Sequence, residues 1–278
     1  MVIGTERGIW RALSPEQLKY HESFLAVHQV GTNEGQNPSG AEFYLALPFK
    51  DLSSRNQRDW RIKAQAFRYL EDVILPPIER EHDQPLQVLD LGAGNGWLSY
   101  RLALRNHYPV AIDLLTDPIE GLGAASHYLQ QLPKLFPRFQ ADMDHLPFAS
   151  GQFDCAIFVA SLHYSRNCYA TLSEAIRCLR PGGTLLIANA RCYKKKSEEE
   201  GDRRHVQQVP SCEPAWGTAV YDEDLMDREI VRAAHALRIS WRVHEPRDAS
   251  RWPISPFIAR WKRNSGASFR IYAASISK

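Results

Sequence analysis

Hydrophobic and polar positions follow two different rhythms along this chain of 278 residues. In the first part, apolar side chains recur at helical spacing, which predicts one helix from Ser14 toward Val30 and a second from about Asn56 to Leu75. A serine at the start of the first helix, with a glutamine three residues later, suits a capping box. The pair Pro76-Pro77 is expected to end the second helix, because the residue before a proline disfavours the helical conformation.

From residue 87 onward the apolar residues come in short runs that end in glycines or polar residues. These runs predict strands at 88–91, 110–113, 138–141, 153–160, 184–190, 239–243 and 268–275. The segments between them predict helices at 97–106, 117–132, 169–179 and 222–237. The run FDCAIFVA is almost continuously apolar, as in a strand that is buried on both faces. Strands that alternate with helices, joined by right-handed crossovers, predict a doubly wound α/β fold.

The change of rhythm divides the chain into two predicted parts. Residues 1–85 are expected to form a helical extension or cap, and residues 86–278 to form the α/β domain. An insertion at about 191–221 interrupts this domain, with lysines at 194–196 followed by glutamates at 198–200. Long loops in compact domains are often functional. The insertion is therefore either a lid or a solvated loop with opposed charges.

A glycine-rich turn, Asp90 to Gly96 (DLGAGNG), joins the first predicted strand of the domain to a helix. Glycine lets the backbone turn sharply and approach a ligand closely, and a helix N-terminus favours an anionic group. The nicotinamide fingerprint GxGxxG would need glycine at position 97, where this chain has Trp97. The triphosphate-binding pattern GxxxxGK followed by Ser or Thr is also absent. The turn therefore disfavours a dinucleotide or a triphosphate.

Asp113 ends the next predicted strand, Val110 to Asp113, about 20 residues beyond Gly92. A carboxylate at this edge of a parallel sheet is placed to bind ribose hydroxyls. The alternative is a helix cap or a turn aspartate. Because the glycine-rich turn lies just upstream, ribose binding is the favoured interpretation.

The order of five segments, VLDLGAGNGW, AID, ADMDHLPF, GQFDCAIF and LRPGG, resembles the class I S-adenosylmethionine-dependent methyltransferases. It is most similar to the small-molecule branch called type 11. The resemblance covers about residues 86–190 and is poor in the flanks, which normally choose the substrate. It implies a Rossmann-like, mostly parallel sheet of seven strands, with the strand at 268–275 inserted antiparallel. S-adenosylmethionine is the implied methyl donor, and no metal is expected.

The resemblance also implies roles for individual residues. The cofactor-binding residues would be Asp90, Gly92, Ala93, Gly94, Asp113, Leu114, Asp142, Met143 and Ala160. Asp90 would orient the methionine amino group through water, and the glycines would let the backbone pass under the methionine part. Asp113 would bind the ribose, whereas Asp142 and the backbone amide of Met143 would bind the adenine. Ala160 would face the amino-acid end of the cofactor.

Methyl transfer to an oxygen or nitrogen could also require a base. The leaving group is neutral, and alignment of the two reactants could supply about 7–11 kcal/mol of the barrier. The candidate base is His163, which follows the fourth strand beside the expected methyl group. The alternative is a histidine packed under the cofactor. Tyr164 and His205 are weaker candidates.

Composition narrows the class of protein. With 34 basic and 32 acidic residues the formal net charge is +2, which does not predict a nucleic-acid or membrane partner, although a local basic patch is compatible with it. Five cysteines, none in a CxxC pair, predict reduced thiols in a cytoplasmic protein rather than disulfides or a zinc site. The N-terminus does not resemble a signal peptide, and no apolar run approaches the ~20 residues of a membrane span.

Two sequence features bear on nucleic acids as acceptors. The segment after the fourth strand reads ASLHY, without the Asp/Asn-Pro-Pro-aromatic motif of enzymes that methylate exocyclic base nitrogens, and the chain has no Pro-Cys pair. The aromatic and basic stretch from Arg251 to Arg263 could stack on nucleic acid or pack as a cap over the sheet edge.

The favoured hypothesis for the function is O- or N-methylation of a small or medium-sized acceptor. The alternatives are an RNA methyltransferase and a non-catalytic module that binds S-adenosylmethionine. The sequence does not predict an oligomeric state.

Overall fold

The computed structural model describes residues 4–30, 40–54, 56–189, 223–246 and 269–276. Two predicted segments lie outside this part of the chain: the insertion at 191–221, which includes His205, and the aromatic stretch from Arg251 to Arg263. No helix in the described part is both long and apolar enough to cross a bilayer. The cytoplasmic location inferred from the cysteines stays a prediction.

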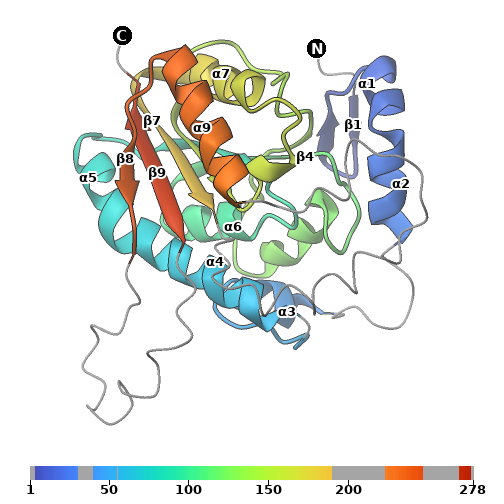
Figure 1. Cartoon of the computed structure of the whole chain (residues 1–278). Coiled ribbons are helices and arrows are strands. Elements are labelled where there is room, and N and C mark those ends of the chain that lie inside the picture. Colours follow the sequence, from blue (N-terminus) through green and yellow to red (C-terminus); the bar gives the residue numbers. More distant parts are fainter. Residues whose placement is uncertain (1–3, 31–39, 55, 190–222, 247–268, 277–278) are drawn as a thin grey trace, which may run out of the picture.

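A single mixed sheet forms the centre of the molecule, with strand order β1-β2-β5-β4-β3-β6-β7-β9-β8 (Figure 1). Its parallel part consists of β3 (Gln87–Leu91), β4 (Tyr108–Asp113), β5 (Arg138–Gln140), β6 (Phe153–Val159) and β7 (Leu179–Asn189). β9 (Arg270–Ser275) runs antiparallel to β7, and β8 (Arg242–His244) runs antiparallel to β9. A strand lies at or near each of the seven predicted ranges, although β8 begins three residues later than predicted, and the antiparallel insertion of β9 is confirmed.

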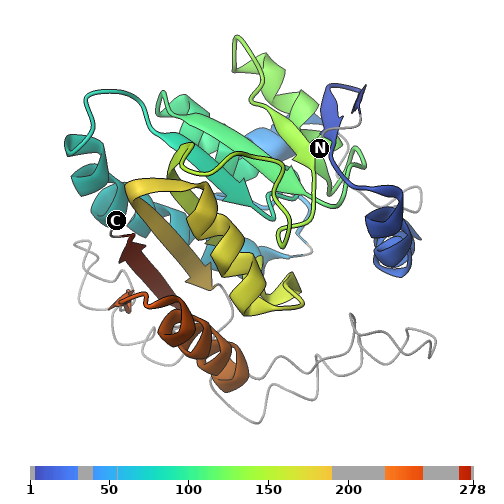
Figure 2. The same cartoon turned by 90° about the horizontal axis from the view of Figure 1, so that it is seen from above.

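Helices cover both faces of this sheet, which confirms the doubly wound α/β class (Figure 1, Figure 2). On one face lie α7 (Cys168–Cys178) and α9 (Glu223–Leu237), whose apolar residues share a core with Leu89 and Leu91 of β3. On the other face lie α4 (Gln57–Tyr69), α5 (Leu75–Arg80) and α6 (Trp97–Leu104). The segment predicted as a helix at 117–132 instead forms a 3-10 helix at Leu122–Gln130.

Within the described ranges the sheet has nine strands rather than seven, because an N-terminal hairpin adds β1 (Gly4–Glu6) and β2 (Ile9–Arg11). The turn of the hairpin is Arg7-Gly8, where both residues have positive φ. β2 pairs in parallel with β5, so the hairpin covers what would otherwise be an open edge of the sheet. Each strand spans three residues, which is too short to show a period in the sequence.

The N-terminal helices differ from the prediction in two places. The capping box is confirmed, since the Gln17 amide donates to Ser14 Oγ at 3.2 Å and the Ser14 amide to Gln17 Oε1 at 2.9 Å. The first helix, however, is divided into α1 (Pro15–Tyr20) and α2 (Glu22–Val30), with His21 as the C-cap of α1.

Pro76 and Pro77 do not end the second helix as predicted. A π-helical turn at Leu70–Ile74 follows α4, and both prolines then lie in the first turn of α5. Proline is tolerated there because the amides of a first helical turn have no partner within the helix. A further short helix, α3 (Ala41–Ala46), precedes α4.

The N-terminal segments share one hydrophobic core with the sheet. Buried residues such as Ile9, Tyr44 and Phe67 belong to the same cluster as Val88 of β3 and Trp97 of α6. This packing fixes the extension against the face of the sheet that carries the glycine-rich turn. The division of the chain at residue 85 stays a prediction.

Candidate functional site

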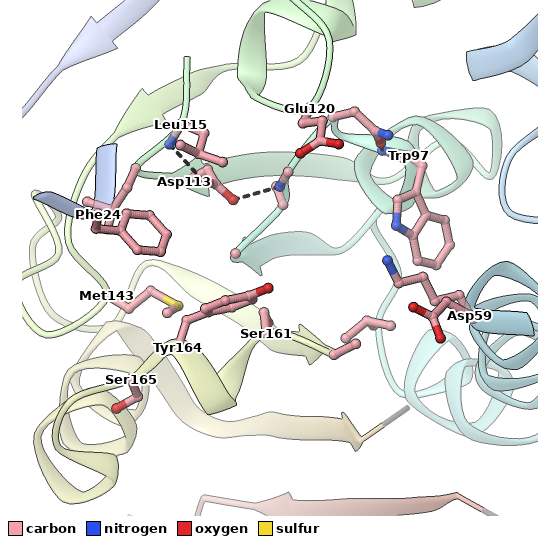
Figure 3. Close-up of a pocket in the computed structure, with 18 of the residues that line it drawn as sticks. Phe24, Asp59, Trp97, Asp113, Leu115, Glu120, Met143, Ser161, Tyr164 and Ser165 are labelled. Carbon is pink, nitrogen blue, oxygen red and sulfur yellow. Dashed lines mark hydrogen bonds between the residues drawn. The ribbon is translucent and has the colours of Figure 1, made fainter. Parts of the chain in front are cut away.

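A cavity of about 830 Å³ opens where β3, β4 and β6 end (Figure 3). Parallel strands end at the same edge of a sheet, so segments far apart in the sequence meet at this place. The structure brings these predicted residues into the cavity wall: Gly92, Ala93, Gly94, Asp113, Leu114, Asp142, Met143 and Ala160. Asp90 and His163 are not among the lining residues.

The glycine-rich turn is fixed by its own backbone. The amides of Gly92 and Ala93 both donate to the carbonyl of Ile112 at 2.9 Å, and the Gly94 amide donates to Asp113 Oδ2 at 2.7 Å. Gly92 has a φ of +74°, and a Cβ there would lie 2.4 Å from the Cβ of Ser161. Only glycine meets both conditions, so position 92 lets the turn pass close to the segment after β6.

Asp113 has a fixed orientation at the end of β4. Its Oδ2 accepts from Gly94, and its Oδ1 accepts from the Leu115 amide at 2.8 Å (Figure 3). Burial raises the pKa of the Asp113 carboxyl, and the hydrogen bonds from these amides oppose the rise. An ionised carboxylate has about four acceptor positions. The residue therefore lines the cavity with acceptor capacity left for hydroxyl groups.

Asp142 is joined to the N-terminal helices. Its Oδ2 lies 2.8 Å from Nε2 of the buried His21 and 3.4 Å from a guanidinium nitrogen of Arg166, and its Oδ1 accepts from the Asp144 amide at 3.0 Å. Burial would raise the pKa of Asp142, but the hydrogen bonds from His21 and Asp144 bring it below its ordinary value. Arg166 in turn lies 3.7 Å from the ring centroid of Tyr20.

Sequence reasoning missed His21. The two partners are 121 positions apart, and no local period relates them. The capping box predicted where α1 begins, but nothing in the sequence indicated that the helix ends at His21.

Asp90 lies behind the turn rather than in the cavity wall. It is 2% exposed, and its Oδ2 accepts from the Ser99 amide at 3.1 Å and from Ser99 Oγ at 2.7 Å. Burial raises the pKa of Asp90 to about 7, against the opposing hydrogen bonds from Ser99. Its contacts therefore hold the first turn of α6 to the end of β3.

After β6, Tyr164 rather than His163 lies in the wall of the cavity. The two rings are 4.2 Å apart, and the ring of Tyr164 is 6.1 Å from that of Phe24 on α2 (Figure 3). The assignment of His163 as a base stays a prediction. Tyr164 was the weaker candidate in the sequence, and its placement beside the cavity favours it.

Helix α4 forms the opposite wall of the cavity. Asn56, which precedes the helix, and Asp59, Trp60 and Lys63 all line the cavity. They recur at the spacing of one helical face. The ring of Trp60 meets that of Trp97 edge-on at 6.1 Å, so the wall is packed against the first residue of α6. The sequence showed Trp60 as part of a helix but gave no sign that this face borders a ligand cavity.

Among the residues that the structure describes, neither the cysteines nor the acidic residues form a candidate metal site. Cys155, Cys168 and Cys178 are free and buried, and burial raises the pKa of each thiol. Cys155 of β6 is fully buried in the core. Within the ranges that the structure describes, no group of three or more His, Cys, Asp or Glu residues could hold a metal ion.

Comparison with known proteins gives a consistent family. Residues 89–187 match the profile of a family described as "Methyltransferase domain". An uncharacterized methyltransferase, YodH, of Bacillus subtilis is 35% identical over 114 residues, which is 40% of this chain and 46% of that protein. A malonyl-[acyl-carrier protein] O-methyltransferase of Geobacter sulfurreducens is 29% identical over 136 residues, 48% of this chain and 49% of that protein. The chain thus spans about half the length of the curated relatives that it matches.

Two solved structures share the fold. The Burkholderia thailandensis 1,6-didemethyltoxoflavin-N1-methyltransferase with bound 1,6-didemethyltoxoflavin and S-adenosylhomocysteine superposes with a TM-score of 0.50 at 14% identity, covering 100% of this chain and 94% of the other. The PH0226 protein of Pyrococcus horikoshii superposes with a TM-score of 0.51 at 17% identity, covering 85% and 99%. At these identities the likeness is one of fold.

Proposed function

Residues 89–187 match the family described as "Methyltransferase domain", and on that premise we propose that this chain is a class I S-adenosylmethionine-dependent methyltransferase that methylates an oxygen or nitrogen of a small or medium-sized acceptor. The observation that carries the proposal is the cavity itself. It brings Gly92, Asp113 and Asp142 together at one edge of the sheet, although they come from three separate strand ends. The relatives named for small acceptors, such as the 27-O-demethylrifamycin SV methyltransferase of Amycolatopsis mediterranei, support this class of substrate.

The residues of the cavity fit the proposed cofactor. The Asp113 carboxylate would accept from the ribose hydroxyls, because two backbone amides already hold it in place. Asp142 would accept from the adenine amine, with Met143 beside it in the same wall. Gly92 would present its backbone to the methionine part of the cofactor, because it lines the cavity and a side chain at that position would collide with Ser161.

When bound, S-adenosylmethionine supplies a methyl group attached to a positively charged sulfur. Once the methyl group is transferred, the sulfur is left as a neutral thioether. The main contribution of the protein is therefore alignment of the acceptor with that group. Tyr164 and Phe24 line the cavity on the side of α2, and Trp60 and Trp97 line or border it on the side of α4. These aromatic walls suit a partly apolar acceptor. An acceptor proton would pass to a base after β6, for which His163 remains the candidate from sequence and Tyr164 the one that lines the cavity.

The first experiment removes the carboxylate assigned to the ribose. Asp113→Ala should weaken S-adenosylmethionine binding by roughly tenfold to a hundredfold in titration calorimetry, because a charge-assisted hydrogen bond contributes about 1.5–3 kcal/mol. Asp83→Ala is the matched control, since Asp83 is exposed and does not line the cavity. Unchanged affinity in Asp113→Ala would overturn the assignment, and a wild-type protein that binds no S-adenosylmethionine would overturn the proposed function.

A second experiment addresses the acceptor. We expect turnover with members of a panel of hydroxylated and amine-bearing aromatic compounds, measured as S-adenosylhomocysteine release. Binding of the methyl donor without turnover on a broad panel would favour a non-catalytic module instead. Binding to bulk RNA that weakens steeply with salt would favour an RNA acceptor.

A further inference from the structure

The amino-acid end of S-adenosylmethionine carries an ammonium and a carboxylate, and the residues so far assigned leave both charges without a partner. Asp90, which the resemblance assigns to the ammonium, does not line the cavity and accepts two hydrogen bonds from Ser99. The inference about which residues bind these two charges rests on the proposed function, because it concerns how the same cavity holds the methyl donor.

The amides of the glycine-rich turn are also largely used within the protein. Those of Gly92 and Ala93 donate to the Ile112 carbonyl, and that of Gly94 donates to Asp113. At the start of α6, the Trp97 amide donates to Asn95 Oδ1 at 3.2 Å, and the Ser99 amide donates to Asp90. A cationic side chain is therefore the stronger partner for a carboxylate bound near this turn.

The basic side chains among the described lining residues are His21, Lys63 and Arg166. His21 and Arg166 both lie against Asp142, at the end of the cavity assigned to adenine. Lys63 comes from α4 and lies at the other end, where its Nζ is 4.4 Å from the ring centroid of Trp60. It is the basic residue on the side of the cavity that the methionine part would occupy.

Asp59 lies one helical turn before Lys63 on the same face of α4. Figure 3 shows Asp59 on the same side of the cavity as Trp97, with Phe24 and Met143 on the opposite side. Both Asp59 and Lys63 are half-buried, which strengthens charge-assisted hydrogen bonds relative to open solvent. Glu120 is the other carboxylate on this side, and it is exposed.

We propose that Asp59 and Lys63 of α4 bind the amino-acid end of the methyl donor. The Lys63 ammonium pairs with the α-carboxylate, and the Asp59 carboxylate accepts from the α-ammonium. A negative and a positive side chain at i and i+4 present two opposite charges side by side, which is the complement of a zwitterion. The contact of Trp60 with Trp97 fixes the distance between this pair and the glycine-rich turn.

The test compares two ligands by titration calorimetry. S-adenosylhomocysteine carries the amino-acid end, whereas 5′-methylthioadenosine keeps the adenosine and the thioether and lacks it. The wild type should bind S-adenosylhomocysteine more tightly by at least about tenfold. Lys63→Met and Asp59→Asn should each weaken S-adenosylhomocysteine binding by about tenfold to a hundredfold and leave 5′-methylthioadenosine binding unchanged. Arg61→Met, an exposed residue of the same helix outside the cavity wall, is the matched control and should change neither affinity.

The possible results separate the two proposals. If the wild type binds neither ligand, the proposed function is wrong. If the wild type binds both and the two variants keep the full preference for S-adenosylhomocysteine, α4 does not hold the amino-acid end. An equal loss for both ligands would also overturn the inference, because it would indicate a general change of the cavity. Should Lys63→Met fail to fold, Asp59→Asn and Lys63→Gln carry the same comparison.

Discussion

Gly92 lines the cavity with a backbone conformation and a close contact that disfavour any side chain. Its positive φ is unfavourable for any side chain by about 1–2 kcal/mol, and an added Cβ would also overlap Ser161 at 2.4 Å. Ser161 cannot move freely, because its Oγ donates to the Leu91 carbonyl at 2.5 Å. We predict that Gly92→Ala lowers the free energy of unfolding by clearly more than the conformational cost alone, as measured by urea denaturation.

Gly151 offers the matched comparison for this prediction. It has almost the same φ, +73°, but a Cβ there would meet nothing within 4 Å. Gly151→Ala should therefore show only the conformational cost of about 1–2 kcal/mol. Equal losses in the two variants would mean that the contact between Gly92 and Ser161 is not a constraint.

Asp90 gives the protein a predicted pH dependence. Burial raises its pKa to about 7 in the folded state, whereas an aspartate in an unfolded chain has a pKa of about 3.9. Between these values the folded protein holds a proton that the unfolded chain releases. The stability that this group contributes is therefore complete below about pH 4 and is lost as the pH rises through about 7.

Asp90→Asn removes this titration and keeps an oxygen that can accept from Ser99. We predict that the free energy of unfolding of the variant, relative to the wild type, rises steadily between about pH 4 and pH 8. Denaturant titrations at several pH values would measure it, with Asp83→Asn at an exposed site as the control. Parallel pH profiles for Asp90→Asn and the wild type would show that Asp90 is ionised in the folded protein at neutral pH.

Among the elements, α1 has a role that its short length does not suggest. Its C-cap, His21, is 2% exposed and lies 2.8 Å from Asp142, so the helix reaches the end of the cavity assigned to adenine.

We predict that His21→Leu lowers the free energy of unfolding by about 1–3 kcal/mol, because it leaves the buried Asp142 carboxylate with one fewer partner. The substitution should also weaken 5′-methylthioadenosine binding, since Asp142 loses the contact that orients it. The control is His145→Leu at an exposed histidine nearby, which should change neither the free energy of unfolding nor the affinity for 5′-methylthioadenosine. If His21→Leu also changed neither, His21 would not hold Asp142 in place.

The elements also show how far sequence patterns reach. Strands β3, β4, β6, β7 and β9 were predictable because each contains an apolar run between turns, and buried parallel strands such as β6 are apolar almost throughout. The hairpin β1–β2 was missed because strands of three residues show no period. The π-helical turn at Leu70–Ile74 was missed because it continues α4 into α5 and lets the two prolines begin a helix.

The residues of the candidate site also divide into those that sequence patterns predict and those that they miss. The residues of the cavity that the sequence indicated lie at strand ends, where topology alone brings Asp113 and Asp142 to one edge. His21, Asp59 and Lys63 enter the cavity from the N-terminal helices, and their positions depend on how those helices pack on the sheet. Packing of this kind leaves no mark in the spacing of residues along the chain.

At the scale of the whole molecule, the N-terminal extension and the sheet share one core. Phe67 of α4 is 1% exposed, and its ring contacts that of Trp97 edge-on at 5.9 Å. Arg101 of α6 strengthens this link, because its guanidinium donates to the carbonyls of Leu45 and Leu47. The α4 wall of the cavity thus depends on the same contacts that join the two parts of the chain.

We therefore predict that the two parts unfold in a single transition. Phe67→Ala should lower the free energy of unfolding by about 3–5 kcal/mol and should shift the whole transition, as followed by far-UV circular dichroism and tryptophan fluorescence together. Val73→Ala, an exposed apolar residue that follows α4 and is 45% accessible, should stay within about 0.5 kcal/mol of the wild type. Two separate transitions, with only one shifted by Phe67→Ala, would show instead that the extension folds independently of the sheet. In that case the α4 wall could open without unfolding the domain, and the affinity for S-adenosylhomocysteine would fall at denaturant concentrations that leave the sheet intact.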